Sequence, residues 1–301
     1  MNKALYAGRL LTAVLLSDYT TWRVGGIAKQ LYRPLNLTDL IIFIRQINRC
    51  EPIIWLGLGS NCLIRDYGIN GTVIVTQGGL KDLALISPNL VRVEAGVSCA
   101  QMARFCARNA LVGGEFWAGI PGTMGGALRM NAGCYGGDTW SLVVTVETVD
   151  IYGNHKIKAA EEFTVAYRYV VLPQDEWFVA ATFKLPNGDK ASAFMNIKNC
   201  LDNRAQTQPT SEYNCGSVFK NPPNDFAARL IESSGLKGKS IGNAEVSAKH
   251  ANFIINKNGG ATATEIETLI EFVQETVYQQ TAVRLEREIH IIGDIGHAQK
   301  N

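Results

Sequence analysis

The chain has 301 residues, of which 47% are hydrophobic and 19% are charged, as in ordinary globular proteins of about two domains. The net charge of +2 and the lack of a Lys/Arg-rich run give no support to a nucleic-acid-binding surface. Seven Cys occur without a C-x-x-C pair or a Cys/His cluster, which argues against a metal site and for free thiols. We therefore expect a cytoplasmic protein without a metal.

The predicted elements mix helices and strands along the whole chain. The apolar run 10–16 is too short for a signal peptide and has no cleavage site, so it favours an amphipathic lead-in segment. In order, we then expect a strand-like segment at 20–26, a helix capped by Thr38 and Asp39 to about 49, strands at 53–56, 73–76 and 91–94, a helix from Ser98 to about 111, strands at 143–152 and 177–185, helices at 191–207, 225–233 and 264–280, and a last strand at 283–292.

Residues 115–138 contain seven glycines interleaved with apolar residues such as Trp117 and Met124. The apolar anchors distinguish this stretch from a solvated linker and indicate a fixed backbone path that another group approaches closely. Two interpretations stay open: a cofactor with a pyrophosphate, or a set of tightly packed turns.

A second glycine-rich turn, GLGSN at 57–61, follows the strand predicted at 53–56. A turn after a strand suits phosphate binding, because its backbone N–H groups can point outward. The third glycine of the dinucleotide fingerprint and the Gly-Lys-Ser/Thr of a Walker loop are both missing. An ordinary turn is the alternative.

Eight motifs in one order resemble a single family. They are TWRVGG at 21–26, GLGSN at 57–61, GIPGTMGGA at 119–127, MNAG at 130–133, YR at 167–168, GSVFKNP at 216–222, KHANF at 249–253 and LEREI at 285–289. The set is similar to the UDP-N-acetylenolpyruvoylglucosamine reductases (the MurB family), and the segment 249–253 is similar to their compact second type. The resemblance runs from about Thr20 to Gly293.

The resemblance implies an α+β fold, with a two-part FAD-binding domain of the vanillyl-alcohol-oxidase (PCMH) type and a C-terminal α+β substrate-binding domain. We place the first at 1–200, with parts at 1–76 and 77–200, and the second at 201–301, with a last strand that returns to the first part. NADPH is the implied co-substrate. The cofactor residues that we expect are Gly57, Gly59, Ser60, Asn61, Gly119, Pro121, Gly122, Thr123, Gly125, Gly126, Asn131, Ala132 and Gly133.

The family match implies three catalytic residues. Hydride addition to an enol ether conjugated with a carboxylate needs a cation near the carboxylate and a proton donor over the adjacent carbon. Arg168 matches the cation and Ser217 the proton donor. Glu288 matches the C-terminal carboxylate, with Glu286 as its rival on the same strand face.

Substrate contacts are predicted for Lys220, Asn221 and Asn252, while His250 is expected to be a satisfied partner rather than a catalyst. The chain departs from the family pattern at Val170, where a small hydroxyl residue is usual, and at Cys134 and the Asn214-Cys215 pair; Cys215 is an alternative proton donor. Two other functions remain open: another FAD-dependent oxidoreductase with the same flavin domain, or a non-catalytic nucleotide-sugar-binding protein. We expect a monomer that binds a UDP-sugar and neither nucleic acid nor membrane.

Overall fold

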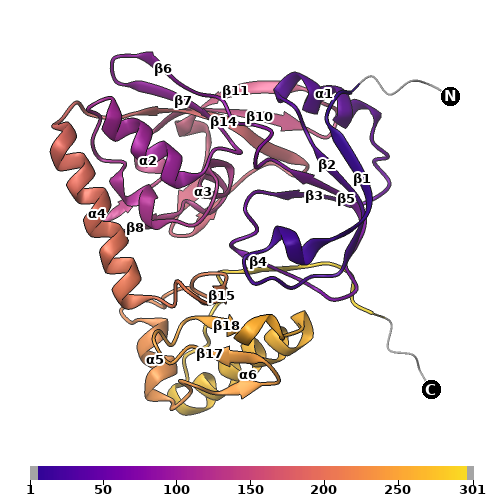
Figure 1. Cartoon of the computed structure of the whole chain (residues 1–301), viewed down its shortest axis with the longest axis vertical. Helices are drawn as coiled ribbons and strands as arrows, with labels where there is room; N and C mark the ends of the chain where they lie inside the picture. Colours follow the sequence, from indigo (N-terminus) through magenta and orange to yellow (C-terminus); the bar gives the residue numbers. More distant parts are fainter. Residues whose placement is uncertain (1–5, 297–301) are drawn as a thin grey trace. The chain divides into compact units, whose positions relative to one another are not determined.

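A computed structural model describes residues 6–296 (Figure 1). The chain forms two compact units. The first contains the described residues up to Leu11 together with Gln30–Leu58 and Gly71–Asn203, and the second contains Thr12–Lys29, Gly59–Asn70 and the described residues from Arg204 onward. Within 6–296, every helix is too short or too polar to cross a membrane.

A four-stranded sheet contains the N-terminal strands in the order β1 (Arg9–Leu15), β2 (Ile27–Arg33), β5 (Ile69–Val75) and β3 (Ile53–Leu56). Helix α1 (Leu37–Gln46) follows β2, and its amide cap is Asn36, whose side chain accepts from the N–H of Asp39. The carboxylate of Asp39 is buried and instead accepts from Tyr32 Oη and from the backbone N–H groups of Ala7, Gly8 and Leu35. The predicted cap at Thr38 and Asp39 was therefore wrong, because Asp39 serves tertiary contacts.

A five-stranded sheet in the first unit has the order β11 (His155–Ala159), β10 (Val143–Asp150), β14 (Glu176–Lys184), β7 (Leu90–Glu94) and β6 (Leu83–Ser87). Helices α2 (Cys99–Arg108) and α3 (Met124–Met130) lie beside each other, and α3 contacts the sheet at β14 and β7 (Figure 1). Side chains alternate along a strand, so Val91 and Val93 enter the core under these helices while Arg92 and Glu94 point to the other face.

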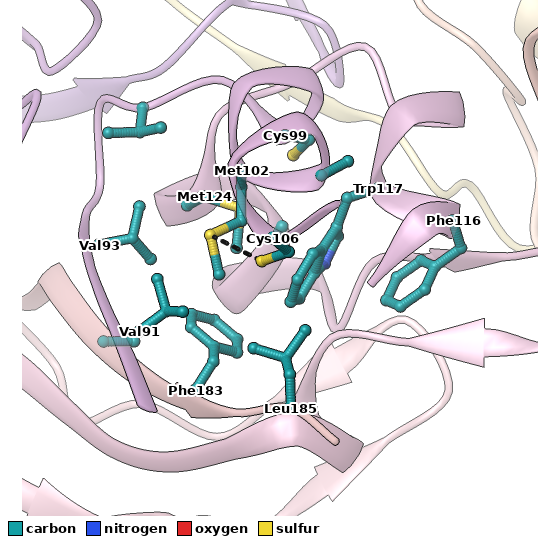
Figure 2. Packing of buried hydrophobic residues seen from close by; sticks show 14 of the residues in the cluster. Val91, Val93, Cys99, Met102, Cys106, Phe116, Trp117, Met124, Phe183 and Leu185 are labelled. Atoms are coloured by element: carbon teal, nitrogen blue, oxygen red, sulfur yellow. Dashed lines mark hydrogen bonds between the residues drawn. The ribbon is translucent and has the colours of Figure 1, made fainter. Parts of the chain in front are cut away.

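The core beneath the helices is built largely from the predicted glycine-rich stretch and α2. Figure 2 shows Met102 and Cys106 of α2 packed beside Trp117, with Phe183 and Leu185 below. Trp117 and Phe183 meet edge to face, with ring centroids 5.1 Å apart. Because such large buried side chains fix the stretch at its start, its glycines lie on a defined path and not in a loose linker.

The remaining elements of the first unit are short, apart from one helix. They are η2 (Glu115–Gly119), β8 (Gly133–Cys134), β9 (Gly137–Asp138), η3 (Trp140–Leu142), η4 (Ala160–Glu162), β12 (Val165–Ala166), β13 (Tyr169–Val170) and α4 (Lys190–Thr207). The division between the units falls within α4, between Asn203 and Arg204.

The second unit has two small sheets packed on a long helix. One sheet has the order β15 (Tyr213–Asn214), β18 (Ile254–Asn256), β17 (Ala244–Val246) and β16 (Ser240–Ile241); in the other, β19 (His290–Ile292) pairs in parallel with β4 (Cys62–Ile64). The other elements are η1 (Leu16–Tyr19), α5 (Ala227–Ser233), η5 (Lys257–Gly259) and α6 (Ala263–Thr281). Helix α6 was expected to begin at 264, and its cap is Thr262. Its residues Ile266, Leu269, Ile270, Val273 and Val277 are buried in the core.

One predicted strand was wrong and another was too long. Residues 20–26 form a turn whose bends include Arg23 at φ +59° and Gly25 at φ +135°. Only His290–Ile292 of the predicted 283–292 strand is assigned to a strand, although an isolated bridge joins Phe219 to Arg287. The expected lead-in at 10–16 is mostly strand β1.

Candidate functional site

A cavity of about 380 Å³ lies in the first unit. One part of its wall is the end of β3 with the turn at Gly57, and the other parts are the start of α3 and the segment 172–178. Trp55 and Trp177 line it and stack on each other, with ring centroids 5.1 Å apart at an interplanar angle of 15°. The cavity therefore combines aromatic surface with backbone that is open at a glycine, a lining that suits a small-molecule ligand.

Gly57 and the side chain of Thr123 lie close together in this wall. A Cβ atom at residue 57 would lie only 2.3 Å from Thr123 Oγ1, so glycine is needed there for two segments to meet. Thr123 is 2% exposed and occupies the N-cap position of α3, yet its hydroxyl makes no capping bond and has no hydrogen-bond partner among residues 6–296. A buried hydroxyl in that state costs about 1–3 kcal/mol, which a ligand with an acceptor group would recover. FAD, which carries many such acceptors, fits this donor.

The predicted cofactor residues divide into two groups. Gly57, Thr123, Gly125 and Gly126 line the cavity, whereas the other predicted members of the 119–133 stretch do not. Those others are Gly119, Pro121, Gly122, Asn131, Ala132 and Gly133. Protein atoms fill the space beside two of them: a Cβ would lie 2.7 Å from the Tyr135 ring at Gly119, and 2.4 Å from Gly137 O at Gly133. Packing alone explains these two glycines.

The remaining predicted cofactor residues, Gly59, Ser60 and Asn61, belong to the second unit. Gly59 has φ +68°, and a Cβ there would lie 2.0 Å from Tyr19 O. The N–H of Thr21 donates to Gly59 O over 3.1 Å. The TWRVGG and GLGSN motifs are therefore fastened to each other by backbone contact, and this close approach requires the glycine.

Arg168 lies at the tip of a two-residue hairpin in the first unit. Strands β12 and β13 pair through Ala166 and Tyr169, which leaves Tyr167 and Arg168 as the turn, with Arg168 at φ +55°. The guanidinium of Arg168 donates to Gly133 O over 2.6 Å and to Asn131 O over 3.4 Å, and it lies 5.1 Å from the centre of the Tyr167 ring. The glycine-rich stretch thus fixes the predicted cation as well as lining the cavity.

In the second unit, the backbone brings Ser217, Glu288 and Asn61 together. The N–H of Glu288 donates to Val218 O over 2.8 Å, so Glu288 lies beside the segment that carries Ser217. Asn61 Nδ2 donates to Glu288 O over 3.2 Å, and the N–H of His290 donates to Asn61 O over 3.0 Å. Two predicted catalytic residues and one predicted cofactor residue therefore meet, although they are far apart in the sequence.

The three predicted substrate residues already have protein partners. Lys220 Nζ forms an ion pair with Glu286, and Asn221 Oδ1 accepts from the N–H of Ala227 over 3.1 Å at the start of α5. Asn252 is 4% exposed, and its amide both donates to Phe219 O (2.8 Å) and accepts from Phe219 N (3.0 Å). Asn252 therefore holds the Ser217 segment in place; a direct substrate contact stays a prediction that these bonds do not support.

Cys215 and His250 are both poor candidates for proton transfer. Burial raises the pKa of the Cys215 thiol well above its ordinary value, and its Sγ faces Cys62 O at 3.8 Å. Burial lowers the pKa of His250, whose Nδ1 accepts from the N–H of Asn252. The neutral ring of His250 fits the satisfied partner expected from the sequence.

Sequence reasoning missed Trp55, Arg129 and the segment 172–178 as parts of the cavity wall. Trp55 lies two residues before Gly57, and Arg129 lies inside the glycine-rich stretch, so proximity to the motifs was the available signal for both. The segment 172–178 carries no motif that would have pointed to it.

Comparisons with known proteins agree on one family. Residues 208–292 match the family profile described as UDP-N-acetylenolpyruvoylglucosamine reductase, C-terminal domain, and residues 28–156 match an FAD binding domain. The chain is 62% identical to the UDP-N-acetylenolpyruvoylglucosamine reductase of Legionella pneumophila (strain Corby), over 95% of this chain and 93% of that one. The crystal structure of the Thermus caldophilus enzyme has a TM-score of 0.83 and 32% identity over 95% of this chain and 99% of that one.

A more distant structure shares the fold alone. The 6-hydroxy-D-nicotine oxidase of Arthrobacter nicotinovorans has a TM-score of 0.56 at 11% identity, covering 92% of this chain and 87% of that one. The FAD binding domain together with the similarity to these reductases defines an FAD-dependent oxidoreductase, and the predicted α+β fold class is confirmed. Within that class, the chain belongs to the UDP-N-acetylenolpyruvoylglucosamine reductase family, as the motifs predicted.

Proposed function

We propose that the chain catalyses the NADPH-dependent reduction of UDP-N-acetylglucosamine enolpyruvate to UDP-N-acetylmuramate, a step in peptidoglycan precursor synthesis. Its 62% identity to a reductase of that name, over nearly the full length of both chains, carries the proposal. The reaction takes place in the cytoplasm, and the protein acts as a monomer.

The bound cofactor would be FAD, and the chemistry that it would supply is hydride transfer from NADPH to the enolpyruvyl double bond. Gly57, Thr123, Gly125 and Gly126, which line the cavity of the first unit, would hold it there. Cofactor contacts of Gly59, Ser60 and Asn61 stay predictions from the motifs. Thr123 donates a hydrogen bond to the cofactor, because its buried hydroxyl has no other partner among the described residues. FAD and the UDP-sugar are thus the proposed ligands.

Arg168 binds the substrate carboxylate and stabilises the negative charge that develops beside it. Its planar guanidinium is held by the carbonyls of Asn131 and Gly133, so little of it needs to be ordered when the carboxylate arrives. A hydrogen bond to a charged group contributes about 1.5–3 kcal/mol. Arg168 is therefore the main electrostatic residue of the reaction.

Ser217 donates the proton to the adjacent carbon. A hydroxyl is a weak acid, and this role works because the acceptor is a strongly basic, carbanion-like centre. Glu288, which the backbone places next to the Ser217 segment, polarises that hydroxyl or restores its proton. Lys220, released from Glu286, and Asn221 contact the diphosphate.

The experiment that tests the proposal measures NADPH oxidation by the FAD-loaded protein with and without UDP-N-acetylglucosamine enolpyruvate. We expect turnover that depends on the sugar nucleotide. If NADPH oxidation by the flavin-loaded protein does not depend on the sugar nucleotide, the chain is another FAD-dependent oxidoreductase. If the protein binds no flavin, it is a non-catalytic nucleotide-sugar-binding protein.

Ser217→Ala separates the two half-reactions. We expect it to keep flavin reduction by NADPH and to lose turnover, because only the second half-reaction needs the proton. Ser240→Ala, an exposed serine of the same unit, is the matched control and keeps both. Turnover that survives in Ser217→Ala would show that water or Cys215, and not Ser217, donates the proton.

A further inference from the structure

The hairpin that carries Arg168 is held on both of its strands by the end of α3. Arg129 Nη1 donates to Val170 O on β13 over 2.9 Å. Asn131 Nδ2 donates to Ala166 O on β12 over 3.3 Å. The position of the hairpin tip therefore depends on two side chains that lie two residues apart in the glycine-rich stretch.

Arg129 also lines the cavity of the first unit. Among the described residues of that wall it is the one cation, and the acidic residues there are Asp175 and Glu176. Glu176 is already engaged by Thr148 Oγ1 and Lys158 Nζ. Arg129 is therefore the positively charged side chain of the wall that an anionic ligand in the cavity can contact.

The guanidinium of Arg129 thus contacts both the hairpin and the cavity. It has five N–H donors in a rigid plane, and the bond to Val170 O uses one of its terminal nitrogens. Because the group is planar and rigid, a ligand bound to one edge fixes the direction of the other edge. Thr123 is the N-cap residue of the same helix, α3, so both Thr123 and Arg129 contact the cavity from one short rigid element.

We infer that Arg129 is a positioning residue that links the bound cofactor to the orientation of Arg168. This inference rests on the proposed function, in which FAD fills the cavity and Arg168 binds the substrate carboxylate. FAD loading then strengthens binding of the substrate carboxylate, and by thermodynamic linkage the substrate strengthens FAD binding by the same factor. A factor of about ten is expected, which corresponds to about 1.4 kcal/mol.

The test is a double-mutant cycle between Arg129→Met and Arg168→Met. Dissociation constants for UDP-N-acetylglucosamine enolpyruvate are measured by calorimetry on FAD-saturated protein without NADPH, so that no turnover occurs. FAD affinity of the cofactor-free proteins is measured separately by flavin fluorescence. Arg129→Lys keeps a charged donor at the same position and serves as the second variant.

We expect Arg129→Met to weaken both substrate and FAD binding about tenfold, and Arg129→Lys to recover part of both losses. Arg168→Met alone should weaken substrate binding, and adding Arg129→Met to it should weaken it little further. Arg45 is the matched control, since its Nη2 donates to Gly153 O over 3.1 Å at another turn of the first unit. Arg45→Met should leave both constants unchanged.

Additive losses in the cycle would overturn the inference, because Arg129 would then not act through Arg168. Unchanged FAD affinity in Arg129→Met would overturn the link to the cavity. If Arg168→Met leaves substrate affinity at the wild-type value, the proposed role of Arg168 fails first, and the two failures are thereby distinguished.

Discussion

The unpartnered hydroxyl of Thr123 predicts a substitution with opposite effects on the empty and the loaded protein. Thr123→Val keeps the shape and the β-branch of the side chain and removes only the hydroxyl. The backbone at Thr123 is extended, at φ −104° and ψ 160°, so valine fits it without strain. We expect the cofactor-free protein to become more stable and FAD to bind less tightly.

The magnitudes follow from the burial of Thr123, which is 2% exposed. Removing a buried, unsatisfied polar group raises the free energy of unfolding of the cofactor-free protein by about 1–3 kcal/mol. If the hydroxyl donates to a charged group of FAD, its loss costs about 1.5–3 kcal/mol of binding free energy. At 1.4 kcal/mol for each factor of ten, the dissociation constant for FAD rises about 10- to 150-fold.

Urea unfolding of the cofactor-free protein and flavin-fluorescence titration supply the two measurements. Thr76→Val is the matched control: Thr76 is also buried and also lines the cavity, but its hydroxyl already donates to Leu56 O over 3.4 Å. The control should lose a little stability and keep its FAD affinity. A Thr123→Val protein that is less stable when empty, or that binds FAD as tightly as the wild type, would refute the reasoning.

Three further predictions concern packing and charge. Gly57→Ala should weaken FAD binding at least about tenfold and lower the urea midpoint of the cofactor-free protein, because its Cβ would lie 2.3 Å from Thr123 Oγ1. Thr123→Ala in the same chain should restore part of the urea midpoint, because it relieves the clash, but not the FAD affinity, because it also removes the hydroxyl. Burial raises the pKa of Glu147, but its bonds to Arg92 outweigh burial, so the pKa is lowered overall. The contribution of Glu147 to the free energy of unfolding should therefore be complete above about pH 4.3 and be lost as the pH falls below that value in urea unfolding. Arg92→Met should flatten this pH dependence. Asn252→Leu should lower the urea midpoint, because it leaves the backbone N–H and C=O of Phe219 without their partner. It should also reduce kcat more than it raises KM, because the segment that carries Ser217 is displaced.

Local chemistry made some elements predictable. Ser98 caps α2 with Gln101 in a reciprocal capping box, a signal that involves four consecutive residues and needs no tertiary context. The helix expected at 191–207 is α4, at Lys190–Thr207. In both cases the deciding interactions lie within a few residues of each other, so a single sequence contains them.

Tertiary contacts decided the elements that the sequence misplaced. Asp39 looks like a helix cap, but four donors from other parts of the first unit surround its carboxylate. The turn at 20–26 has the β-branched residues of a strand, but Trp22 is fully buried and its indole N–H donates to Ile254 O over 2.7 Å. Partners more than two hundred residues away cannot be read from local pattern.

The candidate site shows the same limit. The motifs pointed to Gly57 and Thr123, but no pattern could distinguish a glycine that faces a cavity from one that faces protein. Gly126 lies on the cavity wall, where an added Cβ would come no closer than 3.9 Å to a neighbour, Thr123 Oγ1. Seven residues later, a Cβ at Gly133 would meet a backbone carbonyl at 2.4 Å. Only coordinates separate these two reasons for a glycine.

The two interpretations of the stretch 115–138 turn out not to be alternatives. Its first part, at Thr123 and Gly126, faces a cavity that suits a cofactor, while its later part, at Asn131 and Gly133, is packed turns whose carbonyls hold Arg168. A flexible side chain would have to be ordered at each substrate encounter, at a cost of roughly 0.5–1.5 kcal/mol. If Arg168 binds the substrate carboxylate as proposed, the two fixed carbonyls of the packed turns remove that cost in advance.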